Sequence, residues 1–261
     1  MSLFAYILKL NDFIIDKIYL LHKFFLYLKP GLIRIRLASR KIPRDGKGKE
    51  LIIVLNGPSI KKQQLVNLKN KTTMFVNRGF LLPEYKEIQP NYHVFVDSKL
   101  RDGIWPVTWL DDIVKMCPNI RIILPLSWYN HPTFINYKKS PNIYWLPWEL
   151  PFLNLGVSGG CFSYAIYNQF DKIYFTGFDG DYLFHEILKH SETHFYGNDT
   201  ELSSKTTKDY VIDLFTMSRH FHDLNRLKKY ADRHSLNIYN LTEGGLLDMF
   251  ERKSFDEIVH H

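Results

Sequence analysis

A short apolar run that stops at a turn is the feature that most constrains the fold of this chain. The run comprises Leu51–Leu55 and is followed directly by NGPS, residues 56–59. A run this short and rich in β-branched residues is typical of a strand covered on both faces. Ser59 is a good helix N-cap, so we expect a helix over residues 60–68. The turn then offers an anion cradle of free N–H groups at a helix start, or else an ordinary strand–turn–helix corner.

Short apolar runs and helical patterns alternate along the rest of the chain. Strands separated by helices imply βαβ units, and so an α/β fold with a mostly parallel sheet flanked by helices. The predicted strands are Leu51–Leu55, Thr73–Asn77, His93–Asp97, Ile120–Leu124, Ile143–Leu146, Lys172–Thr176 and Leu236–Asn240. The predicted helices are Lys61–Leu68, Trp109–Met116, Gly160–Phe170 and Lys205–Arg233.

Polar residues and glycines follow several of the predicted strands. In an open parallel sheet the ligand binds outside the carboxyl ends of the strands. Each of these ends alone would suit a plain turn, but together they indicate a site the size of a nucleotide. The residues concerned are Asn56-Gly57, Asn77-Arg78-Gly79, Asp97-Ser98 and Gly177-Phe178-Asp179.

A second glycine-rich segment has the sequence LGVSGGC, residues 155–161, and is expected to be a loop that enters the next helix. Glycines at a helix start let a phosphate or a sugar touch backbone N–H groups, so Ser158, Gly159 and Gly160 are candidate ligand contacts. The segment matches neither the P-loop pattern nor GxGxxG. This argues against a P-loop kinase or ATPase and against a standard dinucleotide dehydrogenase.

The charge and the cysteines restrict partners and compartment. A formal net charge of +7 favours an acidic partner such as a nucleotide, a nucleic acid or an anionic lipid. Basic residues concentrate in residues 29–49, where Asp45 is the single acid. Cys117 and Cys161 lie far apart among apolar neighbours, with neither disulfide nor zinc-ligand spacing. They predict a reducing, cytoplasmic compartment.

The sequence of residues 1–28 predicts an amphipathic helix. Its apolar runs are too short to span a bilayer, and one narrow arc of the helix would hold Lys9, Asp12, Asp16 and Lys23. An apolar helix followed by a basic segment predicts peripheral binding to an anionic membrane, while packing of the helix on the main domain stays open. We therefore divide the chain into an N-terminal segment, residues 1–49, and a catalytic domain, residues 50–261.

Several short motifs occur in an order that resembles one enzyme family. They are NGPSI after the first predicted strand, VN at the end of the second, SGG before a helix, IYFTGFD at the end of a later strand, and THFYG beyond it. The later IYNLTEGGLLDMFER is similar to the closing strand and helix of that family. Over residues 50–252 the chain thus resembles the bacterial lipooligosaccharide sialyltransferases of the Campylobacter and Haemophilus type.

This resemblance implies a single Rossmann-like domain of the GT-A type that binds a CMP-activated sugar and needs no metal. It places Asn56, Gly57 and Ser59 at the nucleotide phosphate and ribose, and Asn77 near the junction of nucleotide and sugar. His194 of THFYG would match the general base of the family. The chemistry of the residue agrees, because an imidazole can accept the proton of an attacking hydroxyl near neutral pH.

The resemblance assigns the other contacts with some departures from the family pattern. It places Ser158 and Gly159 by the sugar carboxylate and the base. Tyrosine hydroxyls stabilise the leaving phosphate in this family. Here Tyr182 lies near one expected position but is offset, and either Tyr196 or Lys189 of the same loop would substitute for the second. Asp97 stands where the family tends to have asparagine and would bind a ribose hydroxyl. A CMP-Kdo donor therefore stays open beside CMP-sialic acid.

Two groups of residues suggest a metal, and we expect neither to hold one. His185, His190 and His194 lie among Glu186, Glu192 and Asp199, but without a spacing such as HExxH. The sequence Asp179-Gly180-Asp181 matches the DxD of other transferases only superficially, and we expect Asp179 to bind ribose or to structure its loop. No cofactor is predicted.

The acceptor side and the long helix carry weaker predictions. Residues 99–106 and 128–141 are candidate acceptor loops, in which aromatic residues would form a wall for a sugar face: Trp128, Tyr129, His131 and Phe134. The polar residues of the long helix are expected on a solvated face: Arg219, His220, His222 and Arg226.

The sequence thus predicts an inverting glycosyltransferase that transfers sialic acid or a related 2-keto acid sugar to a cell-surface glycan. Such an enzyme of lipopolysaccharide or capsule biosynthesis would lie on the inner face of the cytoplasmic membrane; self-association into a homo-oligomer stays open. One alternative is a pterin diphosphokinase-like enzyme with magnesium on Asp97, Asp179 and Asp181. A non-enzyme alternative is a nucleic-acid-binding module, which only the basic charge favours, since no recognised motif is present.

Overall fold

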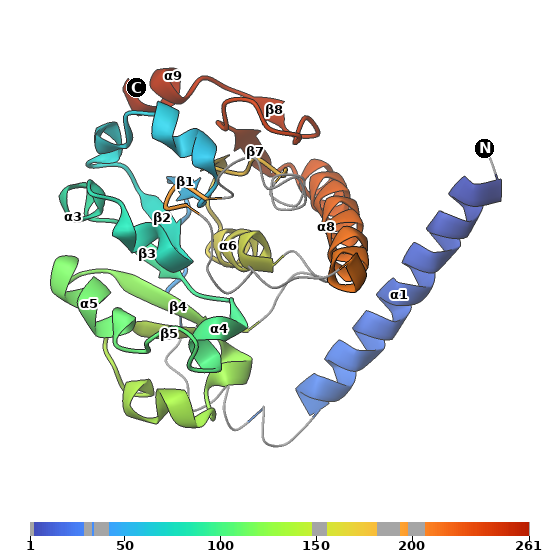
Figure 1. Ribbon diagram of the computed structural model, residues 1–261, viewed down its shortest axis with the longest axis horizontal. Coiled ribbons are helices and arrows are strands. Elements are labelled where there is room, and N and C mark those ends of the chain that lie inside the picture. Colours follow the sequence, from blue (N-terminus) through green and yellow to red (C-terminus); the bar gives the residue numbers. More distant parts are fainter. Residues whose placement is uncertain are drawn as a thin grey trace.

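The computed structural model describes residues 3–28, 33, 42–147, 156–181, 194–197 and 207–260. Its centre is an eight-stranded sheet in the order β5-β4-β3-β2-β1-β6-β7-β8 (Figure 1). Every pairing of neighbouring strands in this sheet is parallel. The mostly parallel α/β fold predicted from the sequence is therefore confirmed.

Each predicted strand is present close to its expected bounds. The sheet also contains a charged strand of two residues, β8 (Glu251–Arg252), which has too short a pattern to be predicted. The other strands are β1 (Glu50–Val54), β2 (Thr73–Val76), β3 (Tyr92–Val94), β4 (Arg121–Pro125), β5 (Ile143–Leu146), β6 (Lys172–Thr176) and β7 (Asn237–Asn240).

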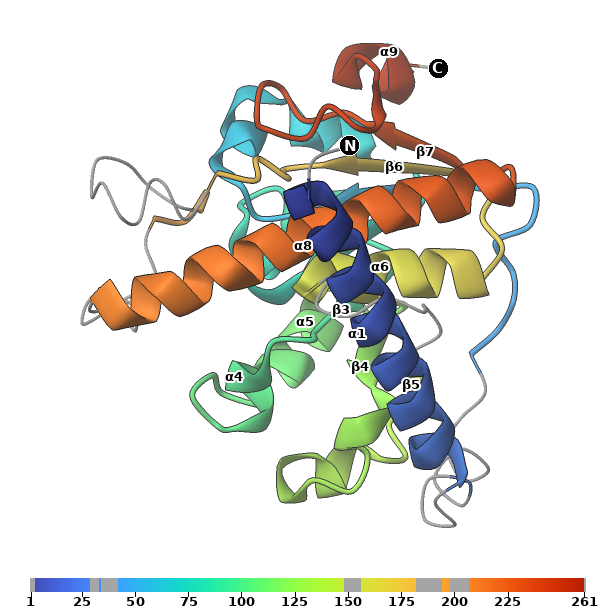
Figure 2. The ribbon, with the colours of Figure 1, turned by 90° about the vertical axis from the view of Figure 1, so that its right-hand side faces the viewer.

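Helices cover both faces of the sheet, and the alternation of the strand side chains decides which core each residue joins. Leu51 and Ile53 of β1 lie in the core with α6 (Gly156–Tyr167) and α8 (Thr207–Arg233), which Figures 1 and 2 show together on one face. Burying one such side chain stabilises a fold by about 1.5–3 kcal/mol. Ile52 and Val54 lie in the opposite core, with α3 (Tyr85–Ile88), α5 (Trp109–Met116) and α9 (Phe255–His260).

The helix expected over residues 60–68 is wrong in type. The segment forms two 3-10 helices, η1 (Pro58–Lys62) and η2 (Leu65–Leu68), and Ser59 lies inside η1 instead of capping a helix. Gln63 interrupts it in an extended conformation. The buried Gln63 amide donates to Leu241 O at 2.8 Å and accepts from Thr176 Oγ1 at 2.7 Å. These tertiary hydrogen bonds hold Gln63 toward β6 and β7, which a continuous helix would not allow.

The glycine-rich segment is helical, which corrects a second prediction. Helix α6 begins at Gly156, so Ser158, Gly159 and Gly160 lie in its first turns and are buried, not in a loop before it. The glycine at position 160 has a packing reason. A Cβ there would lie 2.5 Å from Val96 Cγ2, so a side chain would separate the helix from the sheet.

The last residues of the basic segment pack on the α/β body. Arg121 at the start of β4 donates two hydrogen bonds to the Asp45 carboxylate, at 3.0 and 2.8 Å. The bonds from the Arg121 guanidinium lower the pKa of Asp45, against the opposing effect of its partial burial. Asp45 N–H also donates to Asn168 Oδ1 at 3.2 Å, and Ile42 is buried in the core.

The N-terminal segment contains α1 (Leu3–Leu28), which Figure 1 shows as a straight helix beside the body, on the side of α8. Large apolar side chains along α1 are exposed, among them Leu3, Ile7, Phe13 and Phe24. Among the described residues, no helix is both long enough and apolar enough to cross a membrane. The division of the chain at residue 49 stays a prediction.

Candidate functional site

The order of the sheet reverses at β1, which lies between β2 and β6. The loops that leave β1 and β6 therefore diverge, and α/β sheets bind ligands in the crevice that this creates. Hydrogen bonds connect the ends of β1, β2 and β6, where polar site residues were predicted from the sequence. Asn56 Nδ2 donates to Val76 O at 3.3 Å, and Gly57 N–H donates to Gly177 O at 2.9 Å.

Asp179 crosses from the end of β6 to the turn after β1. Its Oδ2 accepts a hydrogen bond from Ser59 N–H at 3.3 Å. A Cβ at Gly57 would lie 1.8 Å from that carboxylate oxygen and 2.6 Å from Gly177 O, so only glycine fits there. Burial raises the pKa of Asp179, and the hydrogen bonding with Ser59 opposes this shift. Its carbonyl oxygen accepts from Leu246 N–H at 2.7 Å, so Asp179 joins the loops after β1, β6 and β7.

Two N–H groups of the NGPS turn, those of Gly57 and Ser59, are already used, which favours the ordinary corner over the anion cradle. Gly57 N–H donates to Gly177 O, Ser59 N–H to the Asp179 carboxylate, and Ile60 N–H to Gly57 O. Pro58 has no N–H to give. These three groups are therefore not free to meet a phosphate.

The turn instead presents oxygen atoms. Asn56 Oδ1 and Asn77 Oδ1 are buried and have no hydrogen-bond partner among the described residues. The orientation of the Asn56 amide follows from its neighbour, because Val76 O can accept only from the nitrogen. Leaving a buried polar atom unpaired costs about 1–3 kcal/mol. Such atoms also occur elsewhere, for example in Thr73 and Trp145, but among the described residues those of Asn56 and Asn77 share the carboxyl ends of two adjacent strands.

The structure brings part of the THFYG motif to this turn. Phe195 N–H donates to Asn56 O at 3.0 Å, and Gly197 N–H donates to His194 O at 3.0 Å. The His194 ring stacks on Tyr196, with ring centroids 4.9 Å apart and an interplanar angle of 11°. Two predicted catalytic residues thus lie at the end of β1. Tyr182 and the His185, His190, Glu186, Glu192 and Asp199 cluster lie outside the described residues.

Arg78, which directly follows Asn77, lies among aromatic rings on the same side. Its guanidinium carbon is 5.2 Å from the ring centroid of Trp105, 5.7 Å from that of Trp109 and 5.4 Å from that of Tyr196. Each contact has cation–π geometry. No sequence pattern connects Arg78 with Tyr196, which lies far along the chain, so this contact was not predicted. It places a positive charge beside the His194–Tyr196 pair.

Ser158 of α6 meets α8 at His220. Ser158 Oγ lies 3.3 Å from His220 Nε2, and the His220 ring packs on Phe178, with centroids 5.5 Å apart. Burial lowers the pKa of His220 to about 4. The solvated face predicted for this helix is therefore wrong at His220, and also at Arg219, which is buried. The reason is that this part of α8 packs on α6 and the end of β6.

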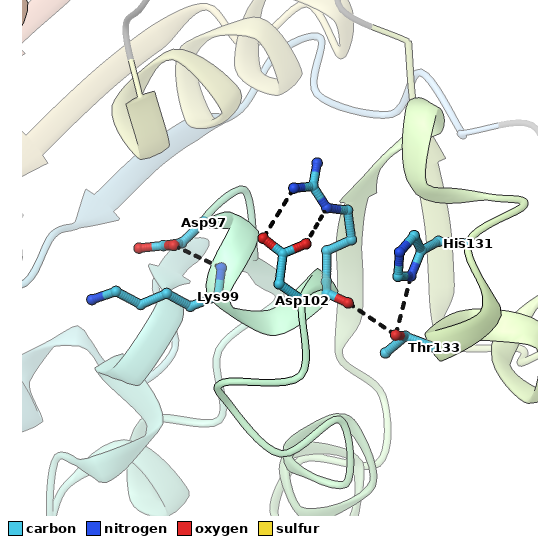
Figure 3. A network of polar contacts seen from close by, with 6 residues as sticks. Asp97, Lys99, Asp102, His131 and Thr133 are labelled. Carbon is cyan, nitrogen blue, oxygen red and sulfur yellow. Dashed lines mark hydrogen bonds and ion pairs between the residues drawn. The ribbon is translucent and has the colours of Figure 1, made fainter. Parts of the chain in front are cut away.

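Asp97 and the acceptor loops lie beyond β3 (Figure 3). Asp97 Oδ1 accepts from Lys99 N–H at 3.0 Å and so caps α4 (Ser98–Arg101). Thr133 Oγ1 donates to Arg101 O at 2.9 Å, so the two predicted acceptor loops touch. The aromatic wall is wrong for Trp128 and Phe134. Both are buried and stack on each other in the core, with ring centroids 5.6 Å apart.

The aspartates of the magnesium alternative do not form a ligand cluster. Within the described part of the chain, no three His, Cys, Asp or Glu side chains lie close enough together to hold a metal ion. The Asp97 carboxylate caps α4, and the Asp179 carboxylate accepts from Ser59 N–H. Each therefore has a structural use of its own.

Two further positioning groups escaped prediction. Arg252 of β8 donates to four carbonyl oxygens of the TEGGLL loop, residues 242–247, which are those of Thr242, Gly244, Gly245 and Leu247, at 2.6–3.2 Å. His93 is fully buried in β3 and hydrogen-bonds Asn77 O. A histidine inside an apolar strand was the available signal for His93, whereas Arg252 gave none because its partners are backbone atoms.

Comparison with known proteins gives one distant likeness. No protein-family model matches the chain. No curated protein matches it either. Among solved structures, the chain is similar to the sialyltransferase CstII from Campylobacter jejuni in complex with a substrate analogue, cytidine-5'-monophosphate, with a TM-score of 0.44 and 16% sequence identity. The match covers 78% of this chain and 84% of that one. Nothing about activity follows from a likeness of this degree.

The Asp179 bridge gives a testable prediction. In Asp179→Asn an amide oxygen can still accept from Ser59 N–H, so we expect the free energy of unfolding to stay within about 1 kcal/mol of the unmodified protein. Asp179→Leu leaves Ser59 N–H unpaired and should lower it by about 1–3 kcal/mol. Urea denaturation measures both variants. Equal destabilisation in the two would show that the charge, and not the hydrogen bond, holds the turn.

Proposed function

We propose that the protein is an inverting glycosyltransferase that transfers a 2-keto acid sugar, such as sialic acid, from a CMP-activated donor to a cell-surface glycan. The observation that carries this proposal is the hydrogen bond from Phe195 N–H to Asn56 O. It brings together NGPS and THFYG, the two motifs that the resemblance assigns to the donor and to the general base. A donor turn beside a histidine is the arrangement that a single displacement needs.

The unpaired oxygens at the ends of β1 and β2 support a nucleoside as the bound group. Asn56 Oδ1 and Asn77 Oδ1 are acceptors and need donors from the ligand. Ribose hydroxyls and the cytosine amino group are donors, whereas phosphate oxygens are not. We therefore assign Asn56 and Asn77 to the nucleoside part of the donor.

The phosphate then needs positive charge or donors from another element. Arg78 lies beside Tyr196, close to the His194 ring. We assign Arg78 and the Tyr196 hydroxyl to the leaving phosphate, because fixed donors that face the developing charge lower the barrier. Tyr182, which lies outside the described residues, stays the other candidate for this role.

His194 would act as the general base. A neutral imidazole accepts the proton of the acceptor hydroxyl while that oxygen attacks the anomeric carbon and CMP leaves from the opposite face. No covalent enzyme intermediate is required. Stacking on Tyr196 limits the rotation of the imidazole ring, which keeps the base aligned. A CMP-Kdo donor satisfies the same geometry, since it also carries a carboxylate at its anomeric carbon.

A nucleotide screen tests the donor. CMP, CDP, UDP, GDP and ATP are compared by thermal shift, with magnesium and with EDTA, because a ligand that binds only the folded protein raises its apparent stability. We expect CMP to stabilise the protein equally in both conditions. Stabilisation that requires magnesium, or that only ATP or GDP produces, would favour the diphosphokinase alternative.

Asn77→Ala should remove most of the CMP-dependent shift. The matched control is Asn70→Ala, because Asn70 also has a left-handed backbone, with φ of 70° against 46° for Asn77, but is exposed and precedes β2. Both substitutions carry similar backbone strain. An equal loss of the CMP effect in both variants would contradict the assignment of Asn77 to the nucleotide.

His194→Ala tests the base. Turnover should fall by about 10²–10⁴-fold, the usual scale for a positioned general base, while CMP affinity changes little. His234→Ala, at an exposed histidine next to the C-terminal end of α8, is the control and should keep full turnover. Steady-state kinetics with a CMP-sugar, together with CMP titration, separates the two effects. Near-normal turnover of a folded His194→Ala enzyme would exclude the base role.

We also propose that the N-terminal segment binds the inner face of the cytoplasmic membrane, where a lipid-linked acceptor would be found. The exposed apolar side chains of α1 and the basic residues that follow it support this. Deletion of residues 1–41 leaves the Asp45–Arg121 pair intact, so we expect an active enzyme that no longer sediments with anionic vesicles. Vesicles of neutral lipid are the control. Unchanged sedimentation of the shortened chain would contradict the anchor.

A further inference from the structure

His93 lies in the middle of the sheet, on β3, and is fully buried. Its ring packs against Tyr85 and Phe95, with centroids at 5.7 and 4.8 Å. Both ring nitrogens are used: Nδ1 lies 2.8 Å from Tyr85 Oη, and Nε2 lies 2.9 Å from Asn77 O. A buried imidazole with a hydrogen bond at each nitrogen therefore connects α3 to the carboxyl end of β2.

The partners of His93 determine its tautomer. Asn77 O can only accept, so His93 Nε2 must carry the hydrogen, and Nδ1 must then accept from the Tyr85 hydroxyl. A second proton on Nδ1 would reverse the direction of the Tyr85 hydrogen bond and bury a positive charge, and burial lowers the pKa of His93 to about 3. The ring is thus neutral, and its hydrogen points at Asn77.

Asn77 has a left-handed backbone conformation, which the hydrogen bond from His93 stabilises. Its φ of 46° is in the left-handed region, which is unfavourable for residues with a side chain, although asparagine tolerates it best. Only 7% of the residue is exposed, and its Oδ1 has no hydrogen-bond partner among the described residues. His93 thus holds the backbone of Asn77 through its carbonyl oxygen, while the buried Asn77 Oδ1 can still accept a hydrogen bond from a ligand at the end of β2.

We infer that His93, oriented by Tyr85, is a positioning residue that holds Asn77 in the left-handed conformation in which its amide oxygen meets the donor nucleotide. This inference rests on the proposed function, because it assigns the ligand of Asn77 from it. His93 itself does not touch the substrate. It acts through one hydrogen bond to the Asn77 carbonyl oxygen.

Substitutions at His93 separate this role from ordinary core packing. His93→Leu keeps an apolar side chain but removes the donor, whereas the side-chain amide of His93→Gln can again donate to Asn77 O. Phe95→Leu is the matched control, because Phe95 contacts the His93 ring in the same core and is itself fully buried. All three variants should lose thermal stability.

CMP affinity of the full-length chain, measured by calorimetry below the melting temperatures, is the deciding quantity. We expect His93→Leu to bind CMP about tenfold more weakly, His93→Gln to recover most of that loss, and Phe95→Leu to bind like the unmodified protein. Unchanged affinity in His93→Leu would overturn the inference. An equal loss in Phe95→Leu would do so too, since it would mean that loosening of the core suffices.

A measurement on the unmodified protein covers the case in which His93→Leu does not fold. Nitrogen-15 NMR of the histidine rings should show His93 as a neutral Nε2–H tautomer with slow proton exchange, and its Nε2 signal should shift when CMP saturates the site. The Nδ1–H tautomer, or a signal unaffected by CMP, would overturn the inference. If the unmodified protein binds no CMP at all, the proposed function fails, and the tautomer alone then decides whether His93 holds Asn77.

Discussion

The site depends on the close contact between Gly57 and Asp179, where the strand order of the sheet reverses. Asp179 can accept from Ser59 N–H only because residue 57 has no side chain, and Gly57 N–H in turn donates to Gly177 O. These contacts close the gap between the ends of β1 and β6. The carbonyl oxygen of Asp179 also accepts from Leu246 N–H, and Arg252 donates to carbonyl oxygens of the same TEGGLL loop. A change in any of these loops would therefore reach the NGPS turn.

This bracing changes what the turn can bind. A strand end that points free N–H groups outward selects anions, but here the N–H groups of Gly57 and Ser59 hold the protein together. The groups left over are the side-chain oxygens of Asn56 and Asn77, which select ligand donors. In the proposed function, recognition of the nucleoside and stabilisation of its phosphate thus fall to different elements. We assign the phosphate side to Arg78 and to the turn that carries His194 and Tyr196.

The sequence predicted those parts of the fold that local pattern decides. Apolar, β-branched runs located the strands, and their separation by helical stretches gave the parallel sheet. The helix after Ser59 was wrong because Gln63 takes part in hydrogen bonds with Leu241 and Thr176, far along the chain. The glycines before residue 161 suggested a loop, although Gly160 serves the close packing of α6 on Val96.

The same distinction applies to the site. Residues at strand ends, such as Asn56, Asn77 and Asp179, were found because a general rule places ligands there. The residues that hold these strand ends and their loops in place, His93 and Arg252, were not predicted. Their partners include backbone carbonyl oxygens, which no sequence pattern marks. Trp128 and Phe134 were assigned to a surface because aromatic residues in a polar loop suit both a sugar and a core.

In the mechanism that we propose, donor binding and the placement of the base are coupled through a weak connection that needs a second support. The hydrogen bond from Phe195 N–H to Asn56 O contributes about 0.5–1.5 kcal/mol. Alone, this free energy would favour the docked THFYG turn over the undocked one by only about two- to tenfold. On the other side, Tyr196 stacks on His194 and contacts Arg78, which Trp105 and Trp109 hold in turn. Since Arg78 directly follows Asn77, both supports of the His194 turn start at strand ends that we assign to the nucleotide. A donor that orders Asn56 and Asn77 would therefore also steady the base.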